Sequence, residues 1–212
     1  MERNLILVGG GGHCKSVIDV AESAGYTILG ILERPSEIGK RVLDYKVIGI
    51  DDDMAKYADK AEFIVTVGQI LSPDLRIHLH QLLSKAGCRL ATIISPTAHV
   101  SKYATVGEGT VVMHQAMVNA DARIGMGCII NTMANIEHDA IIGDYCHIST
   151  GAMVNGECKV GGRCFIGSQS VLSNNITIGD DIVVSAGSFV RKNIMEKGIY
   201  SGNPAILKIK AK

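Results

Sequence analysis

The chain has 212 residues, and its 21 basic side chains are balanced by 21 acidic ones. This balance argues against nucleic acid or an anionic membrane surface as a partner, and no apolar run approaches the roughly 20 residues of a membrane-spanning helix. The first residues, Met1–Asn4 and a short apolar run, lack the pattern of a signal peptide, so we expect a cytoplasmic protein without membrane insertion. Its six cysteines lack zinc-ligand spacing and are expected to be free thiols.

Residues 4–93 alternate strand and helix patterns in the order expected of a small parallel sheet with helices on its faces. The predicted elements are a buried strand at Leu5–Val8, a helix at His13–Gly25, a strand at Ile28–Leu32, a strand at Glu62–Val67, a helix at Pro73–Ala86 and a closing segment at Arg89–Ile93. This pattern predicts an α/β, Rossmann-like N-terminal domain over residues 1–93.

A run of four glycines, Gly9–Gly12, joins the first strand to the first helix. Backbone N–H groups at a helix start can receive a phosphate or diphosphate. The run is not the dinucleotide fingerprint, because Cys14 stands where the third glycine belongs. Glu33, at the end of the second strand, is suited to a ribose or a base edge. Together they predict a nucleotide site without a nicotinamide cofactor, although the loop by itself is also compatible with a plain tight turn.

From Ile94 to position 190, every sixth residue is Ile, Val or Leu. The residue two positions earlier is almost always small, and Cys128, Cys146, Cys158 and Cys164 occupy that register, so these cysteines are expected to be buried fillers. A period of six predicts a left-handed parallel β-helix over residues 94–212, in which three hexads complete a coil of about 18 residues.

His138 is the best candidate for a general base. It lies between Glu137 and Asp139, and a carboxylate that accepts a hydrogen bond from one ring nitrogen fixes the tautomer and raises the basicity of the other. The sequence leaves open which of the two acids orients the ring. Gly156 follows 18 residues later, one coil further on, where its bare N–H can meet a substrate carbonyl and stabilise an oxyanion.

His147 lies half a coil from His138 and should face another direction within one chain. The two can share a site only between subunits, which predicts a homotrimer; the alternative is that His147 is an exposed corner residue. A zinc site is a further alternative, but His114 and His138 are 24 residues apart and fall on different faces, so we expect no metal.

Several segments carry a family resemblance that covers nearly the whole chain: Gly11-Gly12-His13, Asn131-Thr132, Ile136-Glu137-His138-Asp139, Gly143–Ser149 and Gly198–Ala205. With these segments the chain resembles the sugar acyltransferases of the sialic-acid O-acetyltransferase family. Within that family it is most similar to the acetyl-CoA-dependent N-acetyltransferases of UDP-4-amino-sugars, as in bacillosamine synthesis.

The resemblance implies a role for each matching residue. His138 is the general base and Asp139 tunes it, at a position that is often Glu in the family. His147 contacts acetyl-CoA. The other residues implied to bind the co-substrate are Gly156, Ser168 and Ala186, and those implied to bind the nucleotide sugar are Gly11, Gly12, His13, Glu33, Arg34 and Gly68. Glu33-Arg34 replaces an Asp-Asp pair found in many relatives.

The implied reaction is direct acetyl transfer from acetyl-CoA to a sugar amine in bacterial surface glycan synthesis, with no acyl-enzyme and no metal. Two alternatives are O-acetylation of sialic acid and a non-catalytic nucleotide-sugar-binding scaffold.

Overall fold

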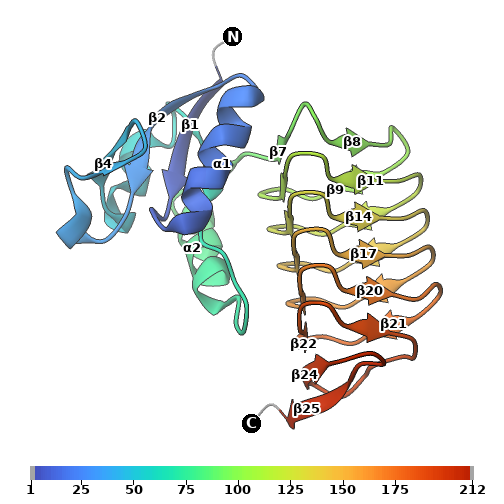
Figure 1. Ribbon diagram of the computed structural model, residues 1–212. Helices are drawn as coiled ribbons and strands as arrows, with labels where there is room; N and C mark the ends of the chain where they lie inside the picture. Colours follow the sequence, from blue (N-terminus) through green and yellow to red (C-terminus); the bar gives the residue numbers. More distant parts are fainter. Residues whose placement is uncertain (1–2, 211–212) are drawn as a thin grey trace.

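The computed structural model describes residues 3–210. An α/β domain stands beside the first coils of a triangular prism of short strands, and the chain ends at the far end of that prism (Figure 1). The α/β domain has a sheet of order β3-β4-β2-β1-β5-β6. Its elements are β1 (Arg3–Val8), α1 (Gly12–Ser23), β2 (Tyr26–Leu32), the 3-10 helix η1 (Pro35–Glu37), β3 (Arg41–Val42), β4 (Tyr45–Gly49), the 3-10 helix η2 (Asp51–Tyr57), β5 (Glu62–Val65), α2 (Asp74–Lys85) and β6 (Arg89–Leu90).

Alternation along β1 places the two helices on opposite faces of this sheet. Leu5 and Leu7 belong to the buried cluster that contains α1, whereas Ile6 and Val8 belong to the cluster that contains Leu79 of α2. The predicted α/β class is therefore confirmed. The antiparallel hairpin β3–β4 was not predicted, since β3 has only two residues and carries no alternating pattern.

The predicted left-handed parallel β-helix is also confirmed. Parallel pairs join residues 18 apart, as in Val112 with Ile130 and Ile130 with Ile148. The eight-stranded sheet contains β7 (Ile93–Ile94), β10 (Val111–Val112), β13 (Ile129–Ile130), β16 (His147–Ile148), β19 (Phe165–Ile166), β22 (Ile182–Val184), β24 (Gly198–Ser201) and β25 (Ile206–Lys210). The six-stranded sheet contains β8 (His99–Val100), β11 (Met117–Val118), β14 (Asn135–Ile136), β17 (Met153–Val154), β20 (Val171–Leu172) and β23 (Phe189–Val190). The five-stranded sheet contains β9 (Thr105–Val106), β12 (Arg123–Ile124), β15 (Ile141–Ile142), β18 (Lys159–Val160) and β21 (Thr177–Ile178).

The second residue of most two-residue strands points into the prism, and the small residue two positions earlier fills the turn. Cys128, Cys146, Cys158 and Cys164 are at most 1% exposed, and all six cysteines are free thiols, as predicted. Ile94 is 38% exposed, because it begins the first coil and no coil covers it on one side.

The corners of the prism share one backbone conformation. From Gly109 to Gly187, one residue in every six has a φ between 56° and 69°. This left-handed region is open to glycine and more accessible to Asn and Asp than to other residues. Asp139 occupies one of these corners with a φ of 60°. The corner geometry thus fixes the backbone at a candidate catalytic residue.

Helix α1 joins the two parts of the molecule in one buried core. Val17 and Ile18 of α1 share a hydrophobic cluster with Ile93, Val111 and Ile129, which point outward from the eight-stranded sheet. Strand β7 spans the predicted boundary at residues 93 and 94 and pairs with β10. The α/β domain is therefore packed on one face of the prism, and its glycine loop is held beside that face.

Neither of the two α-helices found between residues 3 and 210 is long and apolar enough to cross a membrane.

Candidate functional site

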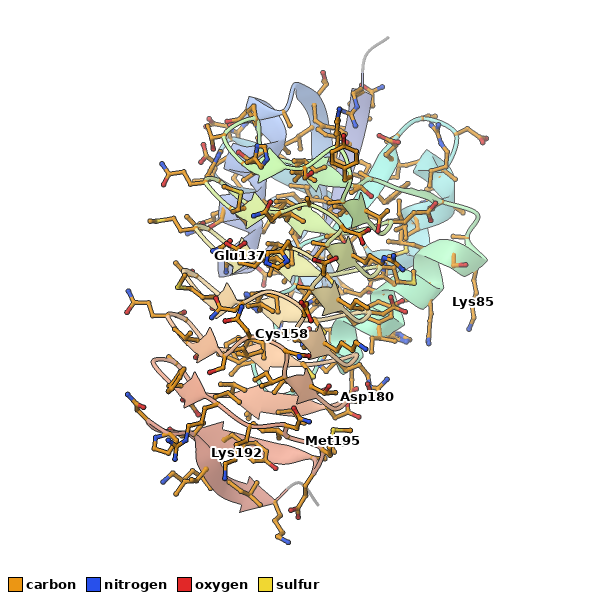
Figure 2. The ribbon with its side chains drawn as sticks, turned by 90° about the vertical axis from the view of Figure 1, so that its right-hand side faces the viewer. Lys85, Glu137, Cys158, Asp180, Lys192 and Met195 are labelled. Atoms are coloured by element: carbon orange, nitrogen blue, oxygen red, sulfur yellow. The ribbon has the colours of Figure 1, made fainter. Side chains whose placement is uncertain are left out.

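His138 lies in the corner that follows β14. Its Nδ1 atom is 2.8 Å from Oδ2 of Asp139, and its Nε2 atom has no hydrogen bond to another described residue. Glu137, labelled in Figure 2 on the side of the prism that faces the viewer, has other partners: its carboxylate accepts hydrogen bonds from Asn119 at 2.9 Å and Asn135 at 3.1 Å. The structure thus resolves the choice that the sequence left open, because Asp139 orients the ring.

The acids around His138 make it a stronger base. The hydrogen bond to Asp139 is the main cause that raises the pKa of His138, and the charges of Asp139, Glu137 and Glu157 raise it further. Because a carboxylate only accepts, Nδ1 of the neutral ring carries the proton and Nε2 presents its lone pair to solvent. Such a ring can take a proton from an attacking nucleophile.

Gly156 lies next to this ring, one coil further along the prism. A Cβ atom at position 156 would be 2.7 Å from His138 Nε2 and 2.8 Å from Cε1. The residue must therefore be glycine if the ring is to stay where it is. The N–H of Gly156 makes no hydrogen bond to another residue between 3 and 210. A free N–H beside a free ring nitrogen is an arrangement that can polarise a carbonyl while its attacker loses a proton.

His147, on β16, belongs to a different part of the surface. The residue is 8% exposed, so the alternative of an exposed corner residue is wrong. The Nδ1 atom is 2.9 Å from the backbone oxygen of Gln69, and Nε2 is 3.0 Å from the side-chain amide nitrogen of Asn131. A cavity of about 440 Å³ is lined by His13, Gly68, Gln69, Ile70, Asn131 and His147. This cavity lies between the α/β domain, which contributes His13 and Gly68 to Ile70, and the β-helix, which contributes Asn131 and His147.

Burial controls the charge of the histidines in this cavity. It is the largest of the causes that lower the pKa of His147 to about 4, and the positive charge of Arg76 adds to it. Burial and the neighbouring His147 and Arg76 also lower the pKa of His13 to about 4. The ring centroids of His13 and His147 are 6.4 Å apart. Both rings are therefore neutral at physiological pH.

The glycine loop presents the start of α1 to solvent. Gly11 is the N-cap residue and makes no side-chain cap, so the first N–H groups of the helix are available to an anion. Two cavities of about 370 and 380 Å³ flank the loop, and Gly11, Glu33 and Arg34 line both. Lys15 lines the first, where a phosphate would meet a positive charge.

Both carboxylate oxygens of Glu33 already have partners within the protein. Its Oε2 accepts the N–H of Gly10 at 2.5 Å, and its Oε1 forms an ion pair with Arg34 at 3.2 Å. The Gly10 N–H is thus already occupied. A phosphate would meet the N–H groups from Gly11 onward instead.

Ser168 and Ala186 lie in successive coils, at corners that follow β19 and β22. The hydroxyl of Ser168 is 2.9 Å from that of Ser149, which follows His147 on the chain. Gly187 donates its N–H to the carbonyl of Ser168 at 2.8 Å. The structure therefore groups these two positions along one edge of the prism, below His147.

A single chain does not bring all the predicted site residues together. His138 follows β14 of the six-stranded sheet, and His147 lies on β16 of the eight-stranded sheet. The residues fall into two groups: His138, Asp139 and Gly156 at one corner, and the cavity residues with the glycine loop at another. Gln69 and Arg76, which contact the second group, were not predicted. In the sequence, a buried arginine differs from an exposed one only by its position on the apolar side of an amphipathic helix.

Within residues 3–210, no three His, Cys, Asp or Glu side chains are placed to hold a metal ion. The features that are present, an oriented histidine beside a bare glycine N–H on a left-handed β-helix and a glycine loop on an attached α/β domain, are those of an acyltransferase.

Comparisons with known proteins agree. Residues 4–80 match the family described as the PglD N-terminal domain. PerB from Caulobacter crescentus, solved with CoA and GDP-perosamine, is 32% identical with a TM-score of 0.90, and the match covers 97% of each chain. The acetyltransferase domain of PglB from Neisseria gonorrhoeae is 29% identical with a TM-score of 0.90, over 98% of this chain and 100% of that domain. WeeI from Acinetobacter baumannii shares the fold at 22% identity and a TM-score of 0.86, over 97% of this chain and 100% of WeeI. No curated protein sequence matches the chain.

The chain belongs to the hexapeptide-repeat family of sugar N-acetyltransferases that includes PglB and PerB. It is therefore an acetyltransferase that uses acetyl-CoA, as the sequence predicted, and the scaffold without catalytic activity is excluded.

Proposed function

We propose that this protein transfers the acetyl group of acetyl-CoA to the amino group of a nucleotide-linked 4-amino sugar, of the UDP-4-amino-sugar type, in bacterial surface glycan synthesis. The observation that carries the proposal is the His138–Asp139 pair beside Gly156. PerB, solved with CoA and the amino sugar nucleotide GDP-perosamine, supports the substrate class. The acetyltransferase domain of PglB, also solved with acetyl-CoA, supports the donor. We place the reaction in the cytoplasm.

In the proposed mechanism the neutral sugar amine attacks the thioester carbonyl directly. Nε2 of His138 takes the proton that the nitrogen loses, and Asp139 stabilises the imidazolium that forms. The Gly156 N–H donates to the oxygen on which negative charge develops. The C–N bond forms, the C–S bond breaks, and the CoA thiolate leaves and is protonated. An amine needs less help than a hydroxyl, because a neutral amine is the stronger nucleophile and loses its proton from the acidic ammonium that forms on attack, whereas a hydroxyl must lose its proton during attack.

The acceptor would bind through the glycine loop. We assign the diphosphate to the N–H groups at Gly11, Gly12 and His13, and Gly68 to the adjoining wall. Glu33 and Arg34 lie at the lip shared by the two flanking cavities, where a ribose or base would come. Acetyl-CoA would lie along the edge that carries His147, Ser168 and Ala186. His147 cannot donate a hydrogen bond from Nε2 there, because its proton is on Nδ1 and its Nε2 faces the amide of Asn131.

We propose that the active enzyme is a homotrimer whose sites lie between subunits. The two groups of site residues are on different sheets of one prism, so a neighbouring subunit must complete each site. The outward side chains of the six-stranded sheet support this arrangement. Met117 and Met153 are 38% and 40% exposed and stand, with Asn135 between them, in one column with Val171 and Phe189. By contrast, the five-stranded sheet carries Arg123 and Lys159 and suits solvent.

The direct test is a panel of acceptors offered with acetyl-CoA while the release of free CoA thiol is followed. UDP- and GDP-linked 4-amino sugars, the same sugars without nucleotide, and free sialic acid should be compared, with His138→Asn as the inactive control. We expect rapid thiol release with an amino sugar nucleotide and a large loss of kcat/KM when the diphosphate is removed. Efficient acetylation of sialic acid with no response to amino sugar nucleotides would replace this proposal by the O-acetyltransferase alternative.

A further inference from the structure

Arg76, on α2, is a buried cation without a carboxylate partner among the described residues. Its side chain is 2% exposed. Nη1 donates to Oε1 of Gln69 at 2.6 Å, and Nη2 donates to the backbone oxygen of Gly127 at a corner of the β-helix. Burial lowers the pKa of Arg76 to about 10, so it stays charged at neutral pH. A buried charge held only by neutral oxygens is costly, which suggests that its position serves the site beside it.

Gln69 connects Arg76 to His147. Its side chain is held between Arg76 and the β-helix, where Nε2 lies 3.4 Å from the backbone oxygen of Cys164. Its backbone oxygen faces Nδ1 of His147 at 2.9 Å. Because a carbonyl oxygen can only accept, Nδ1 must carry the ring proton. Nε2 then accepts from the amide of Asn131 at 3.0 Å.

We propose that Arg76 is a positioning residue that acts through Gln69: it holds the Gln69 loop against the β-helix, so that His147 is kept as the Nδ1–H tautomer with its Nε2 lone pair turned to Asn131 in the cavity. The part of this proposal that concerns catalysis rests on the function proposed above. The geometric part, a fixed tautomer, does not. Nε2, fixed as an acceptor, in turn orients the amide of Asn131, which lines the same cavity.

The charge of Arg76 lowers the pKa of His147, whereas the hydrogen bond from its Nδ1–H to the Gln69 backbone oxygen raises it. The charged group that acts on His147 is Arg76 on α2, while His13 on α1 is itself acted on by both His147 and Arg76. The titratable groups of the β-helix that act on Arg76 are Cys128, Cys146 and Tyr145. Loss of Arg76 should therefore make His147 easier to protonate and should free the loop that fixes its tautomer.

The test compares Arg76→Met, Arg76→Lys and Gln69→Ala with the unchanged protein, using the nitrogen NMR shifts of ¹⁵N-labelled histidine rings. His147→Gln identifies the signals of His147. In the unchanged protein we expect Nδ1 protonated and Nε2 unprotonated down to about pH 5. In Arg76→Met we expect mixed tautomers and titration nearer the ordinary histidine pKa of about 6.5. Arg76→Lys keeps the charge but cannot bridge Gln69 and Gly127 with a planar fork, so it should restore the titration and not the single tautomer.

Activity gives the second readout. A ring misplaced by about 1 Å costs on the order of 100-fold in rate, so we expect kcat/KM of Arg76→Met to fall by about 10- to 100-fold. Arg123→Met is the matched control, since that arginine is exposed and its one ion pair among residues 3–210 is with Asp121, and it should behave like the unchanged protein. If Arg76→Met does not fold, Gln69→Ala takes its place, because it keeps the backbone carbonyl and removes the side-chain contacts to Arg76 and to the backbone oxygen of Cys164.

An unchanged His147 tautomer and titration in folded Arg76→Met and Gln69→Ala would overturn the proposal. If no acceptor of the panel is acetylated, the proposed function fails, but the NMR result still decides whether Arg76 positions His147.

Discussion

Gly156→Ala should damage catalysis while leaving the fold intact. An added Cβ would lie 2.7 Å from Nε2 of His138, whereas carbon and nitrogen atoms without a bond pack at about 3.5 Å. The ring must therefore move by roughly 0.8 Å. This is cheap in stability, because the His138 side chain is 54% exposed and can rotate into solvent. It is costly in rate, because a misplacement of about 1 Å loses on the order of 100-fold.

The matched control for this variant is Gly162→Ala. Gly162 occupies the equivalent place one hexad later, but a Cβ there would come no closer than 3.4 Å to its nearest neighbour, the backbone oxygen of Asp144. Neither glycine has a positive φ. Both variants should therefore keep their melting temperature, with a change in unfolding free energy within about 1 kcal/mol.

The assay is steady-state CoA thiol release with the best acceptor, together with thermal unfolding. We expect kcat of Gly156→Ala to fall by about 30- to 100-fold and that of Gly162→Ala to stay within about twofold. A folded Gly156→Ala protein with full kcat would refute the proposal that the His138 ring, in the position observed here, is the base.

Four further predictions concern the base, its acid partner, the assembly and the buried histidines. His138→Ala should lower kcat by roughly 10²–10⁴-fold with unchanged circular dichroism; full activity in the folded variant would remove the mechanism. Asp139→Asn removes the main cause that raises the His138 pKa, so the acid limb of the kcat–pH profile should move to lower pH; an unmoved limb would contradict the pairing. Light scattering should give three times the 22.5 kDa of one chain, and an active monomer would contradict the shared site. Because the pKa values of His13, His80 and His147 are each lowered from 6.5 to about 4, the unfolded chain binds more protons between these values, and stability should fall with decreasing pH by up to about 1.4 kcal/mol per histidine and pH unit. Thermal unfolding from pH 7 to pH 4 measures this loss, and a constant melting temperature would speak against neutral buried rings.

The sequence by itself determined the β-helix. A parallel coil of 18 residues places each aliphatic residue beside its equivalent in the next coil. The period of the structure is therefore visible as a period in the sequence. The pairing of His138 with Gly156 followed for the same reason, since 18 residues separate them. In the α/β domain, both helices and the main strands were predicted within a few residues, because their apolar patterns are local.

The tertiary structure alone decided the contacts that join distant segments. Whether Glu137 or Asp139 orients His138 depended on the left-handed corner at Asp139 and on Asn119, one coil earlier, which engages Glu137. The burial of His147 depended on where the α/β domain packs, and the hexad repeat of the β-helix does not predict which of its faces that domain covers. The contact of Arg76 with Gln69 and with the backbone oxygen of Gly127 depended on the same packing. Local periodicity reports which residues face inward, but the partners of an outward side chain are set by a surface that is far away in sequence.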